Sequence, residues 1–365
     1  LVAFNGTLDR AGRAVNGSGG LTLNQPLLNP SAFPLYAQAR HQLESERWGA
    51  VQDRRFVAFD TAHAFLVVLT TEHLLEAAQR RLDRATATLK NIEARAGSQL
   101  ASSNDVTRSM IESTSARREV VQAEGSVARA YLLLGFLVGR EVSGPLAAQD
   151  RTTRAAETGG GHSDEDLRSA EARRADVRSA EERTLALRAS AQEPLYRLAP
   201  TISASAQLRL NPAPIAPDSG HDESLQLVLS WNIYDAGLRY ADRRTRLAQA
   251  ESQALDEKQL RRSIATDIAL AVVALKAARD VYKISDEAAT IAQRNTAETE
   301  VLYEHGLARA IEVVDATASR YAAEVSRETS RLAMAQAYLD LRFALGLGPI
   351  DEASPGVAAA KGGTP

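Results

Sequence analysis

Hydrophobic and polar positions follow two different periods along this 365-residue chain. In 201–210 and 225–234 apolar residues alternate with polar ones, which is the period of a β-strand with one apolar and one polar face. The Pro-rich decapeptide between these segments is typical of a loop, so together they predict a strand hairpin with a long connection. A weaker copy stands at the beginning, where 1–9 and 21–28 flank the Gly- and Asn-rich segment 12–20.

Two much longer segments, 31–96 and 236–305, contain almost no Gly and no Pro after Pro34. Each predicts a helix about 100 Å long, at 1.5 Å per residue. A shorter helix follows each after a brief interruption, at 104–139 and 310–346, so each pair predicts an antiparallel hairpin. The second long helix also carries a heptad seam, typical of coiled-coil packing, formed by Ile264, Ile268, Ala271, Leu275, Ala278 and Tyr282.

These parts occur twice. Leu23–Asn29 aligns with Leu229–Asp235, and Leu134–Gly139 aligns with Leu341–Gly346, both at an offset of about 206 residues. The chain is therefore expected to be a duplication of one unit, and by symmetry we expect a further helix to precede Leu1. The expected segments are a first strand hairpin (1–30), a first long helical hairpin (31–139), a linker (140–161), a helix leading into the sheet (162–193), a second strand hairpin (194–235), a second long helical hairpin (236–349) and a disordered tail (350–365).

Composition narrows the class of protein. Aromatic residues are 5% of the chain, there is no Cys, and the formal net charge is −3, so neither a thick globular core, nor a disulfide framework, nor a basic nucleic-acid-binding surface is expected. No uninterrupted apolar run approaches the roughly 18 residues of a membrane-spanning helix. The strands do have the 9–11 residues that a transmembrane strand needs, but four strands leave open edges in lipid. We therefore expect several chains to share one barrel, with the helices projecting into water.

The sequence resembles the TolC-like outer-membrane efflux protein family. The resemblance is carried by the duplicated unit and by Leu23–Leu27, Leu229–Gly237 and Tyr303–Thr317. It implies a mainly α chain with a small β part, in which long antiparallel hairpins form a trimeric α-barrel and four strands per protomer join a shared 12-stranded β-barrel. The protein would lie in the bacterial outer membrane with its helices in the periplasm.

Family membership further implies a passive exit duct for efflux or secretion, with no enzymatic activity and no cofactor. The duct would be a homotrimer in outer-membrane lipid that meets a periplasmic adaptor protein and an inner-membrane pump of the RND, ABC or MFS type. Neither nucleic acid nor a metal is expected as a partner.

Two acidic residues are the strongest functional candidates. Glu312 and Asp315 lie three residues apart, so a helix places them on one face. They resemble the acidic residues around the family's periplasmic entrance, and in a trimer they would form stacked carboxylate rings that favour cations. Without the resemblance, Glu312 and Asp315 are interpreted as ordinary solvated charges on a helix. Glu312 would also interact favourably with the helix dipole, because it lies near the start of the helix.

A second set resembles the family's closed-state latch. Tyr303 and Asp105 match a tyrosine and an acidic residue that hydrogen-bond between neighbouring hairpins, a charge-assisted contact. Asp105 also fits the start of the helix 104–139 as a capping residue. The family's arginine position, two residues after the turn glycine, is here Ala308, and Arg309 stands next to it.

The turns between the paired helices are expected to contact the adaptor. Gly97 and Gly306 are interpreted as turn residues, because Gly reaches positive φ without penalty. Leu100 and Leu307 would be exposed apolar contacts beside them.

Aromatic residues mark the expected end of the strands. Trp231 and Tyr234 fit a membrane interface, where a ring with one apolar and one polar end is favoured, or else packing at the junction between strand and helix.

Two other classes remain as alternatives. A periplasmic coiled-coil adaptor or scaffold would also have long helical hairpins. The other class is a helical di-metal enzyme. His73 with Glu76 and Asp60 with His63 have the i, i+3 spacing of di-iron bundle ligands, but the inward Glu residues of such a site have no counterpart in the sequence.

Overall fold

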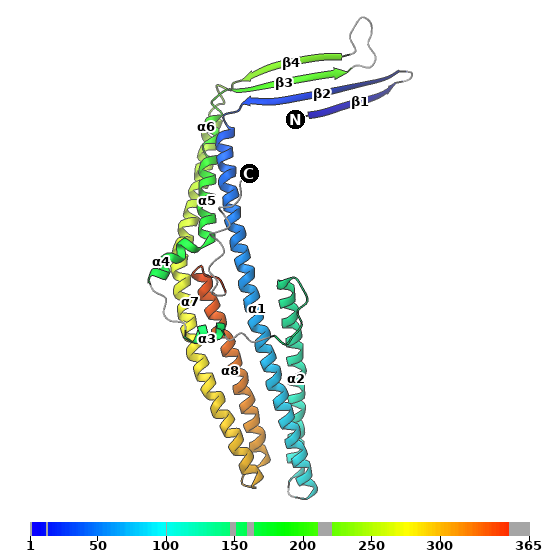
Figure 1. Ribbon diagram of the computed structural model, residues 1–365, viewed down its shortest axis with the longest axis vertical. Coiled ribbons are helices and arrows are strands. Elements are labelled where there is room, and N and C mark those ends of the chain that lie inside the picture. Colours follow the sequence, from blue (N-terminus) through cyan, green and yellow to red (C-terminus); the bar gives the residue numbers. More distant parts are fainter. Residues whose placement is uncertain are drawn as a thin grey trace. The chain divides into compact units, whose positions relative to one another are not determined.

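The computed structural model describes residues 2–11, 14–99, 101–146, 151–158, 164–210 and 221–349, and most of these are helical (Figure 1). In chain order the elements are β1 (Val2–Ala11), β2 (Ala14–Leu28), α1 (Ala32–Gly97), α2 (Ser103–Val138), α3 (Arg151–Thr158), α4 (Asp164–Arg173), α5 (Ala175–Ser190), α6 (Glu193–Tyr196), β3 (Thr201–Leu210), β4 (His221–Ser230), α7 (Leu238–Glu304) and α8 (Ala310–Ala344). The predicted class, mainly α with a small sheet, is confirmed.

The duplication is visible in the lengths of the elements. Helices α1 and α7 have 66 and 67 residues, and helices α2 and α8 have 36 and 35. Both short helices begin after a brief turn, as predicted. Each half of the chain therefore supplies one strand pair, one very long helix and one helix of about half that length.

The chain divides into two compact units. The first consists of Leu1–Gly49 and Asp176–Leu260, and holds the sheet, α5, α6 and the first parts of α1 and α7. The second consists of Ala50–Ala175 and Arg261–Pro365, and holds the remaining helices.

The four strands form one antiparallel sheet in the order β1-β2-β3-β4, so β2 and β3 join the two copies of the repeat (Figure 1). The register places Leu23 opposite Ala206, and Ala206 opposite Leu225. Such cross-strand rows lie on one face of a pleated sheet. The apolar positions of successive strands therefore gather on one face, and Ser205, Gln207 and their neighbours on the other.

Two strand boundaries differ from the sequence prediction. The Gly- and Asn-rich segment 12–20 was expected to be a loop, yet β2 runs from Ala14, with Gly17, Gly19 and Gly20 paired to β1. Here the ladder of backbone hydrogen bonds outweighs the poor strand propensity of glycine. At the other end, β4 spans His221–Ser230, so 231–234 lie beyond the strand that was predicted to contain them.

The middle of the chain also departs from expectation. The segment 140–161 was expected to be a linker, but it contains α3, in which Ala156 is fully buried and accepts a hydrogen bond from Arg279 of α7. The helix expected over 164–192 is broken at Arg174, which separates α4 from α5. Contacts with α7 and α8, which periodicity does not report, hold α3 in place.

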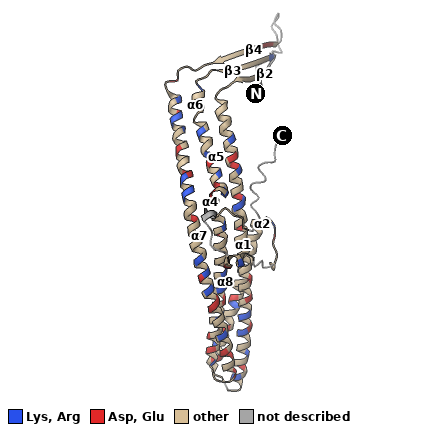
Figure 2. Cartoon of the chain, turned by 60° about the vertical axis from the view of Figure 1, so that its left-hand side comes forward, with Lys and Arg blue, Asp and Glu red and all other residues tan. Residues whose placement is uncertain are grey.

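Helix α7 has two seams. Ile264, Ile268 and Leu275 of the predicted heptad are buried within the protomer. A second row on the same helix, including Leu270, Ile284 and Ile291, is exposed. Figure 2 shows acidic and basic residues interspersed along the helices.

Helix α2 is the one described helix long and apolar enough to cross a membrane by length and composition. Its most apolar 18-residue stretch has a mean hydropathy of 1.2, and 11% of that stretch is buried. Leu132, Leu133 and Phe136 near its end are exposed. The sequence expectation had considered uninterrupted apolar runs, and the run in α2, at 131–134, is far shorter than a membrane span.

Candidate functional site at the helical turns

The turn between α7 and α8, residues 305–309, is a tight structure built around Gly306. Gly306 has a φ of 76°, which confirms the predicted left-handed position. The amides of Leu307 and Ala308 both donate to the carbonyl of Leu302, at 2.8 and 3.3 Å, which closes the end of α7. The same geometry leaves the side chain of Leu307 76% exposed at the outermost point of the turn.

The turn between α1 and α2 uses different chemistry. Gly97 is the last residue of α1 and has no positive φ, so the interpretation of Gly97 as the turn residue is wrong. Gln99 takes the left-handed conformation instead, with a φ of 61°. Leu100 lies outside the described residues.

Helix α2 begins with a capping box. The Ser102 hydroxyl accepts from the Asp105 amide at 3.2 Å, and the Asp105 carboxylate accepts from the Ser102 amide at 3.1 Å. Hydrogen bonds from Ser102 hold the pKa of Asp105 below its ordinary value, and Arg108 and Arg309 act in the same direction. The capping role expected for Asp105 is therefore present in the structure.

One small apolar cluster ties the two turns together. Its buried members come from three helices: Ile92 of α1, Tyr303 of α7, and Ala310 and Val313 of α8. Three partly buried residues pack against it, namely Ala101, Val106 and Ala308. Since Val106 belongs to α2, the cluster draws on all four long and short helices and fixes the two turns relative to each other.

Tyr303 sits at the centre of this cluster, 8% exposed. The guanidinium of Arg95 lies 4.4 Å from its ring centroid, and Arg95 also donates to the Tyr303 carbonyl at 3.4 Å. Within the described part of one protomer, Tyr303 and Asp105 share no hydrogen bond. Arg95 was not singled out by sequence reasoning, because nothing in its local pattern distinguishes it from other helical arginines.

The acidic pair lies on the exposed side of the same region. Glu312 is in the first turn of α8, and Asp315 follows it one turn later; both are exposed. Arg309, which occupies the N-cap position of α8 without a side-chain capping hydrogen bond, donates from Nε to Glu312 at 3.1 Å. The structure thus brings Arg309 to Glu312, and leaves the Asp315 carboxylate accessible.

A second candidate region is the passage from β4 into α7. Trp231 is 57% exposed and its indole donates to the Leu198 carbonyl at 2.9 Å, which fixes one end of the ring. Tyr234 is 83% exposed. Asp235 then caps the helix by accepting from the amides of Gly237 and Arg239, both at 3.1 Å.

The described residues contain no group of three or more His, Asp and Glu side chains placed to hold a metal ion. The pairs that had the spacing of di-iron ligands have other partners. His63 lies 3.3 Å from Asp340, and His73 lies 3.3 Å from Glu328, both across to α8. These imidazoles serve contacts between helices.

Comparison with known proteins gives a consistent picture. Residues 167–347 match the model of the outer membrane efflux protein family. A search of curated proteins found no significant match.

Solved structures share the fold over almost the whole chain. One match is CusC, whose structures concern the conformational changes that accompany folding and transmembrane channel formation. It has a TM-score of 0.75 at 16% identity, and the match covers 95% of this chain and 82% of CusC. The outer membrane protein VceC from Vibrio cholerae has a TM-score of 0.71 at 16% identity, with coverages of 96% and 87%. The CmeC outer membrane channel of Campylobacter jejuni has a TM-score of 0.73 at 14% identity, with coverages of 97% and 79%.

Proposed function

We propose that this chain, whose residues 167–347 match the outer membrane efflux protein family, is a passive channel-tunnel of the bacterial outer membrane. An inner-membrane pump would expel its substrates through this channel. The observation that carries the proposal is the join of a four-stranded sheet with one apolar face to helices of 66 and 67 residues. A sheet of this kind suits lipid, and helices of this kind suit a long aqueous conduit. One chain provides both.

The sheet supports assembly of several copies. Among the described strands, β1 pairs with β2 alone and β4 with β3 alone, so both outer strands keep an unpaired edge. In hydrocarbon an unpaired backbone group costs several kcal/mol. Three chains that pair edge to edge would form a closed barrel of twelve strands, with rows such as Leu23, Ala206 and Leu225 toward lipid and the polar face toward the lumen.

The helices support the same assembly. The exposed row on α7 continues for three heptads, and its members follow the spacing four and three of a coiled-coil seam. They are Leu270, Ala274, Ala277, Val281, Ile284, Ala288 and Ile291. We infer that helices of a neighbouring copy cover this row and the exposed apolar end of α2, because rows of this length rarely stay in water.

The turns are assigned roles on the same basis. Glu312 and Asp315 would form two carboxylate rings around the periplasmic entrance, which favour cations. Leu307, Gly306 and Gly97 would meet the helices of a periplasmic adaptor, which couples the channel to its pump. The latch between Tyr303 and Asp105 would form between hairpins of neighbouring copies, with Arg309 close to both carboxylates of Glu312 and Asp105.

Reconstitution tests the proposal directly. The purified full chain should run as a trimer in detergent after crosslinking, and should conduct ions in planar lipid bilayers. A chain that remains monomeric and makes no pores would refute the channel. Membrane fractionation separates this reading from a periplasmic coiled-coil adaptor, since only the channel must be recovered with outer-membrane lipid.

A further inference from the structure

Three histidines of α1 each meet a carboxylate on a helix from the second half of the chain. His41 lies 2.7 Å from Glu182 of α5, His63 lies 3.3 Å from Asp340 of α8, and His73 lies 3.3 Å from Glu328 of α8. Imidazole is the side chain that ordinarily changes charge near neutral pH. Of the three carboxylates, only Glu328 is buried, at 7% exposed, so its pair has the greatest weight.

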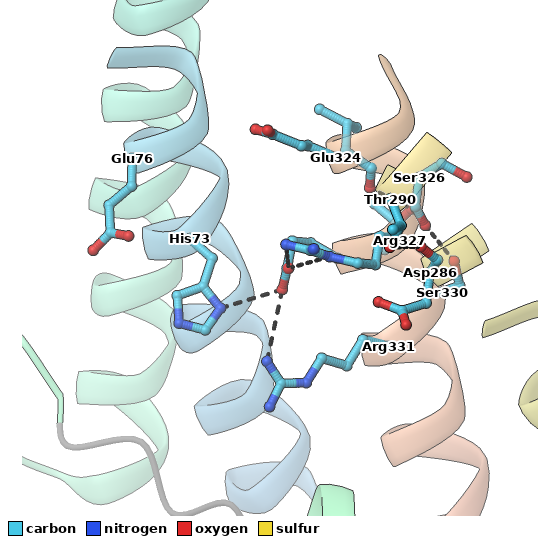
Figure 3. Close-up of polar contacts among 12 residues, drawn as sticks. His73, Glu76, Asp286, Thr290, Glu324, Ser326, Arg327, Ser330 and Arg331 are labelled. Atoms are coloured by element: carbon cyan, nitrogen blue, oxygen red, sulfur yellow. Dashed lines mark hydrogen bonds and ion pairs between the residues drawn. The ribbon is translucent and has the colours of Figure 1, made fainter. Parts of the chain in front are cut away.

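Figure 3 shows His73 of α1 near Arg327 and Arg331 of α8, and the Glu328 carboxylate contacts all three side chains. One carboxylate oxygen accepts two hydrogen bonds from Arg327, at 3.0 and 3.1 Å. The other faces His73 at 3.3 Å and Arg331 at 3.9 Å. Arg327 and Arg331 belong to α8, so among these partners only His73 carries the contact across to α1.

A water-accessible hollow of about 250 Å³ lies beside this pair. It is lined by α1 and α8, so protons exchange with the imidazole without any opening of the helices. The charged and titratable groups around the pair are Glu76 and Arg80 on α1, Glu324, Arg327 and Arg331 on α8, and Tyr282 and Asp286 on α7. Glu157 on α3 acts on Tyr282.

We propose that His73 is a proton-dependent fastener between α1 and α8, which binds Glu328 strongly as an imidazolium in acid and more weakly once the imidazole has lost its proton. Two charged partners make a stronger hydrogen bond than a neutral ring and a carboxylate. The contact therefore joins the two helices tightly at low pH and weakly at high pH.

The direction of this pH dependence follows from the hydrogen bond and the charges around His73. The hydrogen bond to Glu328 raises the pKa of His73 above its usual 6.5, against the opposing effect of burial. Glu328 and Glu76 raise it further by their charge, and Arg331 lowers it. A raised pKa means that the contribution of His73 to stability is fully present below pH 6.5 and is lost as the pH rises through the higher folded-state value.

The consequence for the molecule is mechanical. Helix α1 belongs to the first hairpin and α8 to the second, so a link between them opposes the movement of one hairpin against the other. In the channel proposed above, acid would hold the hairpins together and mild alkali would loosen them. The fastener itself does not require that the chain form a pore.

Distances between spin labels test the fastener in the full-length protein. The chain has no native Cys, so Gln79→Cys on α1 and Ala322→Cys on α8 place a label on each helix at an exposed position. Labelled chains are diluted with unlabelled chain, so that an oligomer carries one labelled copy. Between about pH 5.5 and about pH 8.5 the imidazole loses its proton, and the distances should become longer and more broadly distributed.

Two variants identify the group responsible. His73→Gln keeps a hydrogen-bond donor that does not titrate, and most of the pH response should disappear. His305→Gln is the matched control, because the only hydrogen bond of the His305 ring within the described residues is with the nearby Val301 carbonyl at the end of α7, and it should respond like the unmutated protein. Distances that do not change with pH in the unmutated protein would overturn the fastener, as would a His73→Gln variant that responds as strongly.

Conductance gives an independent readout. If the channel forms, its conductance should differ between the two pH values, and the difference should shrink in His73→Gln. Absence of pores would count against the proposed function and leave the distance result standing.

Discussion

Arg239 donates from Nε to the carboxylate of Asp235 at 2.7 Å, at the point where the chain leaves β4 and enters α7. Arg239 is 4% exposed, and it also donates to the Asn232 carbonyl at 3.0 Å. One buried guanidinium thereby turns the backbone away from the sheet, while Asp235 caps the helix that follows. This contact explains why β4 ends at Ser230, although the alternation of apolar residues continues beyond it.

The Asp235 contact should fail in acid. Its hydrogen bond with Arg239 holds the pKa of Asp235 below the ordinary 3.8, so its stabilisation is present above pH 3.8 and is lost as the pH falls through the lower folded-state value. Asp235→Asn should therefore lower the unfolding temperature at pH 7 and differ progressively less from the unmutated protein below pH 3.8. Thermal unfolding followed by circular dichroism over this range checks it. Asp256→Asn, at an exposed carboxylate of α7, is the control and should change little at either pH.

Gly306 and Gly97 should respond to substitution by alanine with opposite changes in stability. Gly306→Ala places a Cβ in the left-handed region and should cost about 1 kcal/mol of stability. Gly97→Ala adds a Cβ to the last residue of α1, and no atom lies within 4 Å of it. Because Ala has a higher helix propensity than Gly, this variant should gain up to about 1 kcal/mol of stability. Unfolding temperatures of the two variants, measured side by side, decide the matter. Equal losses at both positions would contradict the assignment of the turn to Gly306 and Gln99.

Removal of Arg81 should be costly. Arg81 is 7% exposed and pairs with Glu112 at 2.8 Å and with Glu119, both on α2, while its guanidinium lies 4.8 Å from the ring centroid of Tyr321. Arg81→Met leaves two carboxylates without their shared counter-charge, and should lose about 3 kcal/mol of unfolding free energy.

The neighbouring Arg80 provides the control for this substitution. Its side chain is 49% exposed, and its ion pairs with Glu76 and Glu324 are longer, at 3.6 and 3.8 Å. Arg80→Met should cost about 0.5 kcal/mol or less. Chemical denaturation of both variants gives the comparison, and equal costs would show that α1 and α2 do not depend on the Arg81 cluster.

The acidic pair should set ion selectivity. Glu312→Gln with Asp315→Asn removes the charge and keeps the side-chain size, so the preference of the channel for cations should fall and block by divalent cations should weaken several-fold. Reversal potentials in asymmetric salt and titration with a divalent cation measure the two effects. Glu298→Gln, at an exposed acidic position within α7, is the matched control. A double variant with unchanged selectivity would leave Glu312 and Asp315 as ordinary surface charges.

Much of the architecture could be predicted because it follows from the periodic spacing of apolar residues along the chain. The two long helical segments contain almost no Gly or Pro, and the second carries a heptad seam, so their bounds were predicted to within a few residues. Gly306 was identified as a turn residue because a positive φ leaves a local signature. The duplication was visible because both copies kept their order and offset.

The tertiary structure decided what depends on residues distant in sequence. Pairing with β1 made a strand of the glycines in 14–20, and contacts with α7 and α8 made a helix of part of the expected linker. No local pattern distinguished Arg95, Arg239 or Glu328 from their many charged neighbours, because their roles come from partners that the fold brings to them. Sequence alone determined the elements and their repetition, which arise from short-range periodicity. The fold determined where buried charges meet, because a charge in a low-dielectric interior is defined by its surroundings.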